Sequence, residues 1–373
     1  MFKFIYQVAS ILPGLFHISN TLSFPAPNGP YNTSLTITAI KDKHRLDPFA
    51  PTQQPRVLMI SIFTPVHPSS CNASLSAYME PTTAAFEDAR LEAYGLPSGI
   101  FESLSLQTCQ HDSLDLPDFP IILFSPAAGT TRLFYSAMAQ QIASAGYIAV
   151  TIDHPYDGDI VVFPDNTTVF GLDFTDDQIP LAVDTRAKDI SFVLNQLARP
   201  GIMGTLNIDC GANVSKSGVF GHSLGGAASA EAMLFNSRLV GGVNLDGTFF
   251  GDVVEKGLHR SFLIFAHDGK NLTNDPSWEA LWPRLTSWKR ELMLAQSAHY
   301  TFSDLPDVVD ILGLGGLLPS EAEEMLGSIN GSRAFEVVTT YVQSFFDMVL
   351  KGKDSELFGG PVEEYPEVSF GGY

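Results

Sequence analysis

Basic residues are scarce in this chain. Its 373 residues include 21 Lys and Arg against 41 Asp and Glu, which gives a formal net charge of −20 at pH 7. Binding to nucleic acid depends on clustered Lys and Arg that neutralise phosphates, so this balance excludes nucleic acid as an expected partner. The same surplus of acidic groups disfavours simple electrostatic docking on an anionic membrane.

Cysteine is also rare, and its spacing does not resemble a zinc site. The three cysteines are Cys71, Cys109 and Cys210. In an oxidising compartment Cys71 and Cys109 are expected to pair and to hold the N-terminal region, leaving Cys210 free or buried. The alternative is three buried thiols, since free cysteine is among the most buried residue types.

The N-terminus lacks an uninterrupted apolar run of membrane-spanning length. The segment MFKFIYQVASILPGLFHISNTLS has a basic Lys3, an apolar stretch broken by Gln7 and Pro13, and a polar end with small residues. These features predict a secretory signal peptide over residues 1–23, cleaved after Ser23, in preference to a permanent membrane anchor.

Acceptor motifs for N-glycosylation are spread along the rest of the chain. Such motifs arise often by chance, but their spread behind a signal peptide favours a secreted glycoprotein. The six asparagines that begin these motifs are Asn32, Asn72, Asn166, Asn213, Asn271 and Asn330.

The chain shows no internal repeat and no clear linker. From residue 120 onward, short apolar runs such as PIILFSP, YIAVTIDHP and LVGGVNLDG alternate with helical patterns. This alternation predicts an α/β fold with a mostly parallel central sheet and helices on both faces. We expect one domain over residues 24–353 with an N-terminal extension, an irregular region over 67–117 with one helix near 84–93, and a C-terminal tail over 354–373 that wraps on the surface or is disordered.

The segment SGVFGHSLGGAAS contains the pattern G-x-S-x-G, Gly221 to Gly225, between a predicted strand and an Ala-rich helix. A serine on such a strand-to-helix turn projects its hydroxyl at the carboxyl end of the sheet, where the following helix N-terminus favours developing negative charge. Small residues at Gly221 and Gly225 leave room for the turn. We therefore predict that Ser223 is a nucleophile; the alternative is a small-residue turn.

A nucleophilic serine needs a general base and an acid that orients it. His299 opens the polar loop after the apolar run ELMLAQSA and is the best-placed base, whereas His222 lies in the nucleophile turn and is expected to face away from the oxyanion side. Two acids end consecutive predicted strands, Asp246 and Asp268. Spacing alone does not decide between them, and the later strand slightly favours Asp268.

Two backbone N–H groups should form an oxyanion hole. One is that of Leu224, directly after the nucleophile, and the other comes from the small-residue loop Ala127–Ala128–Gly129 after the run IILFSP. Small side chains there let the backbone approach a substrate carbonyl, although any tight strand-to-helix turn has the same composition.

These motifs together resemble one family. The segments ILFSPAAGTTRLFYSAMAQQIASAGYIAVTIDHPYDG, GVFGHSLGGAAS, GGVNLDGTFFG and AHYTFSD are similar, in order and spacing, to the plasma-type platelet-activating-factor acetylhydrolases, also called lipoprotein-associated phospholipases. The resemblance runs from about Arg56 to Gly352. It implies an α/β-hydrolase fold and an enzyme without metal or cofactor that cleaves short or oxidised acyl chains from glycerophospholipids.

The resemblance also implies individual roles. It assigns the acid to Asp246, which follows Leu245 as in the family's L-D motif, and leaves Asp268 in reserve. Ala128 matches the family's second oxyanion donor, although the loop reads P-A-A-G where the family has H-G-L-G. Phe249 and Phe250 are candidates for the acyl pocket, with core packing as the alternative.

Three functions follow from the sequence. The main one is a secreted serine esterase acting on acetyl or other short-acyl esters of glycerophospholipids. The others are a general secreted carboxylesterase or polyester hydrolase, and a catalytically silent binding protein. The apolar segment VVDILGLGGLLP after His299 is either a peripheral contact with a lipid surface or a buried helix.

Overall fold

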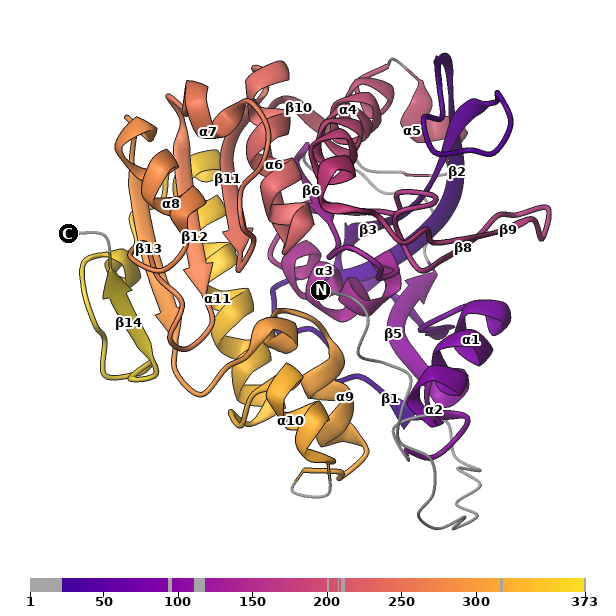
Figure 1. Ribbon diagram of the computed structural model, residues 1–373. Coiled ribbons are helices and arrows are strands. Elements are labelled where there is room, and N and C mark those ends of the chain that lie inside the picture. Colours follow the sequence, from indigo (N-terminus) through magenta and orange to yellow (C-terminus); the bar gives the residue numbers. More distant parts are fainter. Residues whose placement is uncertain are drawn as a thin grey trace.

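The computed structural model describes residues 22–92, 96–110, 118–199, 201–206, 208, 212–315 and 318–371. Nearly all of the predicted signal peptide, and Cys210, lie outside these residues. A nine-stranded sheet dominates the described part, with β14 at one edge and β2 at the other (Figure 1). Its strands, in spatial order, are β14 (Val368–Gly371), β13 (Lys289–Leu294), β12 (Ser261–Ala266), β11 (Leu239–Leu245), β10 (Ala212–His222), β6 (Phe119–Ser125), β7 (Ile148–Ile152), β3 (Pro55–Val66) and β2 (Asn32–Leu46).

The sheet is parallel through its centre and antiparallel at both edges. All pairings from β7 through β13 are parallel, whereas β3 and β2 at one edge and β14 at the other run antiparallel to their neighbours. Because parallel strands are joined by crossover helices, the central strands are covered on both faces and are largely apolar where they are buried. This confirms the predicted fold class.

Alternate residues of β6 show the two-sided burial directly. Ile121 and Leu123 pack on one face of the sheet with helices α4 (Ile179–Leu197) and α6 (Leu224–Phe235). Ile122 and Phe124 pack on the other face with α3 (Ser136–Ser144) and α11 (Gly331–Lys351). The period-two alternation of a strand therefore divides the core into two layers.

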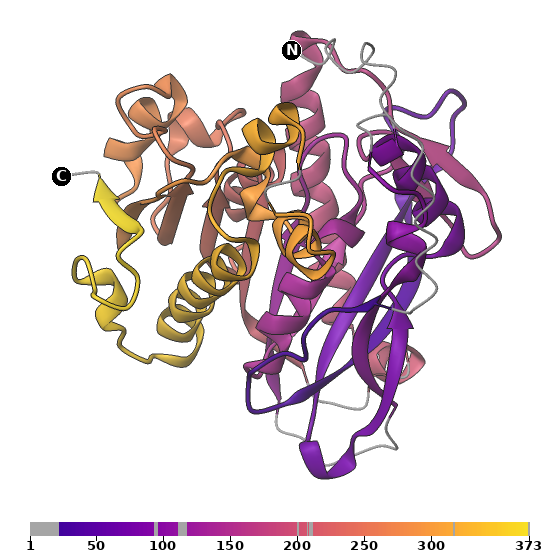
Figure 2. The same cartoon turned by 90° about the horizontal axis from the view of Figure 1, so that it is seen from below.

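Helix α11, the shorter helices and a β-hairpin complete the structure around the sheet. Figure 2 shows the long α11 beside the α9 segment, on the face that also carries α3. The remaining α-helices of the described residues are α1 (Pro81–Glu92), α2 (Ile100–Ser103), α5 (Ile202–Thr205), α7 (Val253–Lys256), α8 (Pro276–Leu281), α9 (Leu305–Ile311) and α10 (Ser320–Leu326). A hairpin of β8 (Ile160–Val162) and β9 (Thr168–Phe170) follows β7.

The N-terminal extension carries a second, three-stranded sheet. It consists of β1 (Leu22–Ser23), β5 (Leu104–Gln110) and β4 (Asn72–Ala77), in that order. The expected irregular region over 67–117 is therefore wrong for β4 and β5. Their sequences, NASLSA and LSLQTCQ, are short and rich in Ser and Thr, and they give only a weak alternating signal.

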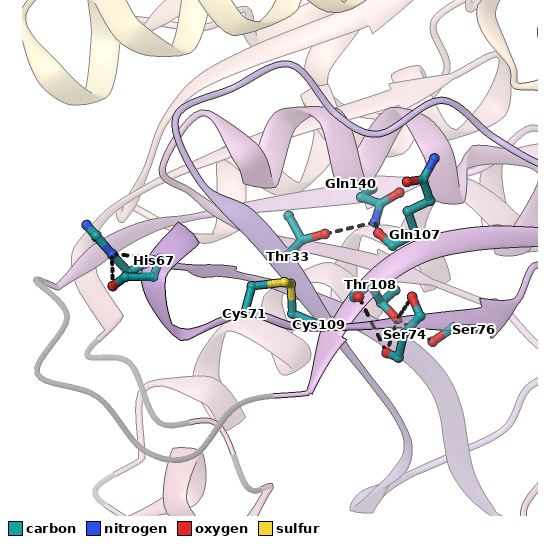
Figure 3. Close-up of a disulfide and its surroundings, with 10 residues drawn as sticks. Thr33, His67, Cys71, Ser74, Ser76, Gln107, Thr108, Cys109 and Gln140 are labelled. Carbon is teal, nitrogen blue, oxygen red and sulfur yellow. Dashed lines mark hydrogen bonds between the residues drawn. A yellow bond between two sulfur atoms is a disulfide. The ribbon is translucent and has the colours of Figure 1, made fainter.

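A disulfide holds this small sheet together. Cys71, just before β4, is bonded to Cys109 in β5, with the two Cα atoms 5.1 Å apart (Figure 3). Next to Cys109, Thr108 Oγ1 forms hydrogen bonds with the hydroxyls of Ser74 and Ser76 at 3.1 and 2.9 Å. Gln140 of α3 donates to Thr33 Oγ1 and to the carbonyl of Gln107, which ties the small sheet to the main domain.

The C-terminal segment joins the domain. We expected residues 354–373 to wrap on the surface or to be disordered, but Val368–Gly371 pairs with β13 as the last strand of the central sheet. Tyr365 is 5% exposed and packs against Tyr341 of α11. The apolar alternation in this segment is too short to stand out from its Gly- and Pro-rich surroundings, which is why the sequence did not reveal the strand.

Helix α9 and the residues after it belong to the apolar segment that follows His299. Val308 is buried, and Ile311 and Leu312 pack against the core beside α11. This favours the buried helix over the lipid contact for the part of the segment before residue 316. Among the described residues, none of the helices combines the length and apolar character needed to cross a membrane.

Candidate active site

The predicted nucleophile turn lies between β10 and α6, near the centre of the sheet. Ser223 has φ +55° and ψ −123°, a strained conformation for a residue with a side chain. A Cβ atom at Gly221 would lie 2.3 Å from the carbonyl group of Gly225, and one at Gly225 would lie 2.0 Å from the carbonyl oxygen of Ser125. The two glycines are therefore required by close packing, and the half-buried Ser223 emerges between buried neighbours.

The acid turn follows the adjacent strand, β11. Asp246 also has a positive φ, +59°, and its carboxylate is almost fully buried. The turn is fixed by Asn244, whose side chain bonds both backbone groups of Gly247, and by Trp278, whose indole donates to the Gly247 carbonyl. The backbone N–H of Ser223 donates to Leu245, so the acid turn and the nucleophile turn are in direct contact.

His299 is brought to Asp246 by the turn after β13. It opens the 3-10 helix η5 (His299–Phe302), and its Nδ1 lies 2.5 Å from Asp246 Oδ2. The centre of its ring is 4.7 Å from that of His222, the residue directly before Ser223. With Nδ1 on the carboxylate, Nε2 is the ring nitrogen left for a reacting proton, which is the arrangement of an orienting acid and a general base.

His222 is buried and bonded elsewhere. Its Nδ1 lies 2.9 Å from the hydroxyl of Tyr135, and its Nε2 has no hydrogen-bond partner among the described residues. Burial, followed by the charge of His299, lowers the pKa of His222 well below its ordinary value, so the ring is neutral. A buried, neutral imidazole that packs against His299 supports the prediction that His222 is not the base.

The reserve acid points elsewhere. Asp268 is exposed, and its carboxylate accepts a hydrogen bond from the backbone of Gln296 at 2.8 Å. Between the two acids that the sequence left open, the structure places Asp246 against the imidazole of His299. The hydrogen bond from Gln296 to Asp268 instead joins the loop after β12 to the turn after β13.

A second imidazole on the acid was missed by sequence reasoning. His267, which directly follows β12, places its Nδ1 2.7 Å from both carboxylate oxygens of Asp246, and its backbone N–H donates to Oδ1. Lys270 lies nearby and donates to the backbone carbonyl of Asp246. The only sequence signal was the position of His267 at a strand end, which it shares with several other residues.

These donors control the charge of Asp246. Burial by itself raises the pKa of the carboxyl group, but the bonds from His267 and His299, together with the Lys270 ammonium, outweigh it and hold the pKa below the ordinary value. The carboxylate is therefore ionised throughout the neutral range, as an orienting acid requires.

The predicted oxyanion loop follows β6, next to the nucleophile strand. Ala127 donates its N–H to the Tyr135 hydroxyl at 3.2 Å, and Gly129 donates to the carbonyl of Asp157 at 2.9 Å. Between them, the N–H of Ala128 has no protein acceptor among the described residues, and neither has that of Leu224 at the start of α6. Both groups suit donation to a substrate oxygen.

A buried cation holds this loop from beneath. Arg186 of α4 donates to the carbonyls of Pro126 and Ala127 and pairs with Asp157 at 2.5 Å. The backbone carbonyl of Asp157 also accepts the hydrogen bond from the N–H of Gly129. The ion pair between Arg186 and Asp157 therefore holds the chain on both sides of Ala128. Sequence reasoning missed this arginine, because the pattern of α4 shows only an amphipathic helix.

A further layer supports the loop through Ser125. The Ser125 hydroxyl lies 2.9 Å from His154 Nε2, whose Nδ1 lies 2.9 Å from Asp189. Arg56 binds the same carboxylate. All of these side chains are 1% exposed or less, so His154 has a local hydrogen-bonding role and lies out of reach of a substrate.

The two phenylalanines after the acid turn pack in the interior. Phe249 is 2% exposed and its ring contacts those of Phe262 and Trp278. Phe250 is partly buried and packs against the same core. This burial favours core packing, the alternative named for both residues, and a role of Phe249 and Phe250 in an acyl pocket stays a prediction.

Comparisons with known proteins agree with this architecture. A family model described as platelet-activating factor acetylhydrolase, isoform II, matches residues 96–163, which include the oxyanion loop. A probable 1-alkyl-2-acetylglycerophosphocholine esterase of Arthroderma benhamiae is 34% identical over an alignment of 389 residues, which covers 97% of this chain and 96% of the relative. The chain belongs to the platelet-activating-factor acetylhydrolase family. The resemblance described from the sequence is thereby confirmed.

A solved structure extends the comparison of this acetylhydrolase-family chain. A ferulic acid esterase from Streptomyces cinnamoneus superposes with a TM-score of 0.80 at 30% identity, covering 94% of this chain and 99% of the other. Relatives and structure together identify the chain as an esterase of this family with an α/β-hydrolase fold.

Proposed function

We propose that this chain is a secreted serine esterase that hydrolyses acetyl and other short-acyl esters of glycerophospholipids. The observation that carries the catalytic part is the bond between His299 Nδ1 and Asp246 beside the strained turn of Ser223. The substrate class is supported by the relative from Arthroderma benhamiae, whose name describes esterase activity on a 1-alkyl-2-acetylglycerophosphocholine.

The proposed reaction begins with attack of Ser223 Oγ on the ester carbonyl carbon. His299 Nε2 takes the hydroxyl proton, and Asp246 holds the resulting imidazolium in place. The carbonyl oxygen becomes an oxyanion that accepts hydrogen bonds from the N–H groups of Ala128 and Leu224. The oxyanion then collapses, the bond to the lysolipid oxygen breaks, and His299 protonates that oxygen as it leaves.

The second half of the cycle releases the acid. A water molecule attacks the acyl-enzyme, and its proton goes to His299 Nε2 while the oxyanion forms again in the same site. Collapse expels Ser223 Oγ, which recovers its proton from His299. Every step uses side chains and backbone groups of this chain, and we expect no metal or cofactor to take part.

Secretion belongs to the proposal. It is supported by the signal-like N-terminus, by the disulfide between Cys71 and Cys109, and by the exposure of the predicted glycosylation sites. All six acceptor asparagines lie at the surface, four of them exposed and two partly exposed: Asn72, Asn166, Asn213 and Asn330, and Asn32 and Asn271. Mass spectrometry of protein collected from the culture medium, with and without glycosidase treatment, tests secretion and glycosylation.

Contact with a lipid surface also belongs to the proposal. Phe170 and Leu172, at the end of the β8–β9 hairpin, are 55% and 50% exposed, which gives an apolar face on the loop that follows β7. Sedimentation with phosphatidylcholine vesicles tests this contact, and Phe170→Ser should reduce the bound fraction if the hairpin takes part.

The test of activity compares two substrates on one preparation. The parent protein and Ser223→Ala are assayed with an acetylated ether phospholipid and with a short-chain aryl ester. We expect the parent to hydrolyse both and Ser223→Ala to lose at least about a thousandfold in kcat, since removing the nucleophile disables the whole triad. A Ser223→Ala variant with the full rate would overturn the assignment.

A second candidate is a general carboxylesterase without preference for phospholipids, which includes a polyester hydrolase. The structural similarity to a ferulic acid esterase favours it. The same assay separates the two: a kcat/KM for the aryl ester well above that for the phospholipid identifies the general esterase. A catalytically silent binding protein is the third alternative, and activity on neither ester would identify it.

A further inference from the structure

Three potential metal ligands meet at the orienting acid. In the described part of the chain, Asp246, His267 and His299 form the one group of at least three such side chains, with one ligand atom from each lying within 4.8 Å of the others. We propose that this trio is a binding site for a transition-metal dication of the Zn²⁺ type, and that the bound ion inhibits the esterase. The inhibition rests on the proposed function, whereas the binding does not.

The distances suit a small ion after a short movement. Nδ1 of His299 and Nδ1 of His267 lie 2.5 and 2.7 Å from Asp246 Oδ2. In a tetrahedral zinc site with metal–ligand bonds of about 2.0–2.1 Å, ligand atoms are separated by roughly 3.4 Å. Each imidazole therefore needs to move away from the carboxylate by less than about 1 Å to admit the ion.

Both imidazoles are partly exposed to solvent, which favours that movement. Their side chains are 32% and 38% exposed, whereas the carboxylate of Asp246 is fully buried and held by the backbone of His267. The site thus combines one fixed ligand with two that reach it from the surface. An ion can enter from solvent and keep water in its fourth position.

The kinds of ligand select the ion. Two imidazole nitrogens and one carboxylate oxygen suit Zn²⁺, Cu²⁺ and Ni²⁺, while Ca²⁺ and Mg²⁺ require six or more oxygen ligands, or several waters around carboxylates. Lys270 opposes any cation, because its ammonium lies 3.9 Å from Asp246 Oδ1. We therefore expect selective binding of moderate affinity.

Coordination would remove the base function of His299. The metal takes the lone pair of Nδ1, so the proton of the neutral ring must sit on Nε2. That tautomer has no free lone pair at Nε2 and cannot accept the proton of Ser223. No bond in the substrate changes and no redox step occurs; the proton only moves from Nδ1 to Nε2 through solvent.

The test uses the full-length protein and ZnCl₂ in a buffer that does not bind metals. Esterase rates are measured against Zn²⁺ concentration for the parent, for His267→Asn and for His259→Asn, each relative to its own metal-free rate. His259 is a matched control, because it is exposed and bonds Thr286 away from the trio. Binding is measured separately by calorimetry on Ser223→Ala, with and without His267→Asn.

We expect Zn²⁺ to inhibit the parent and His259→Asn equally and reversibly with EDTA, and MgCl₂ to have no effect. In His267→Asn the Zn²⁺ concentration for half inhibition should rise by at least about tenfold, and the calorimetric Kd by a similar factor. An uninhibited parent, or equal inhibition of His267→Asn and the parent, would overturn the inhibitory site. The calorimetry still decides on binding if the protein proves to lack esterase activity, so the two proposals fail separately.

Discussion

Ser223 and Asp246 both occupy backbone conformations that side chains rarely adopt, directly after the adjacent strands β10 and β11. Their φ angles are +55° and +59°. Such conformations are costly and persist where the surroundings impose them. Here the two turns impose them on each other, since a Cβ at Gly247 would meet the carbonyl oxygen of Ser223 at 2.0 Å. Ser223 and Asp246 are therefore positioned by one packed contact.

The choice between the two acids can be tested at this scale. Asp246→Asn should lower kcat by about a thousandfold or more, because the amide cannot hold His299 in the required tautomer. Asp268→Asn is the control, as its carboxylate bonds only the backbone of Gln296 among the described residues, and its kcat should stay near that of the parent. Steady-state kinetics with the aryl ester measures both, and a large loss confined to Asp268→Asn would reverse the assignment.

Tyr135 is expected to act through the oxyanion loop. Its hydroxyl joins the N–H of Ala127 to the ring of His222, so Tyr135→Phe leaves the loop without that anchor. We expect kcat to fall about tenfold, or ~1.4 kcal/mol in the barrier, with KM nearly unchanged, because the loop binds the oxyanion more than the ground state.

Tyr147→Phe controls for a general loss of stability in this comparison. Tyr147 is also buried, but its hydroxyl bonds Asp347 on α11, far along the chain from the loop. Its removal should lower the melting temperature without changing kcat. Equal kcat values for Tyr135→Phe and the parent would show that the loop keeps its shape without the hydroxyl.

At the scale of elements, the strands and helices at the centre of the main sheet can be predicted from the sequence, whereas the strands at the edges and in the small sheet cannot. The apolar run of β6 and the Ala-rich α6 are bounded by glycine and proline, so local pattern predicts them well. In contrast, β5 is partly polar and β14 has only 4 residues. They become strands because a neighbouring strand supplies their hydrogen bonds, and this is information that a local pattern does not contain.

The same distinction applies to the site. Ser223 lies in a local motif, and His299 follows from chain order, so both could be predicted. The choice of Asp246 needed a family resemblance, because two strand ends offered equivalent acids. His267 and Arg186 act through contacts with residues 21 and 59 to 60 positions away, which no local pattern reveals.

The disulfide should stabilise the N-terminal extension. It closes a loop of 38 residues, for which loss of chain entropy in the unfolded state predicts roughly 2–4 kcal/mol. Replacing both Cys71 and Cys109 by Ser should lower the free energy of unfolding by that amount in urea denaturation. Thr108→Val is the control, because it removes neighbouring hydrogen bonds and leaves the disulfide intact. An unchanged urea midpoint in the double Cys variant would contradict the expectation.

At the scale of the whole molecule, two buried carboxylates, Asp189 and Asp246, make a pH-dependent contribution to stability. Burial raises the pKa of Asp189, but Arg56 and His154 outweigh it, so its native pKa lies below the ordinary value, as that of Asp246 does. In the unfolded chain such groups take up protons near pH 4. Below that pH the unfolded state binds more protons than the native state, so the stability that these groups contribute is present above about pH 4 and is lost as pH falls through the native values.

Comparison with a variant isolates this contribution from the net charge of −20, whose self-repulsion weakens on acidification. Between pH 6 and pH 3 the parent should lose more unfolding free energy than Asp246→Asn, which has no carboxyl group to protonate at that site. Urea denaturation at each pH measures the difference. Parallel curves for the two proteins would show that Asp246 does not contribute.

The strand that completes one edge of the central sheet is the last described segment to be synthesised. Until residues 368–371 leave the ribosome, β13 presents an unpaired edge to the surroundings, and such edges can pair with other chains. During synthesis the chain therefore passes through a stage in which the central sheet lacks only β14 and the edge of β13 can still form hydrogen bonds with another chain. Protection of this edge during synthesis is therefore a requirement for producing the folded protein.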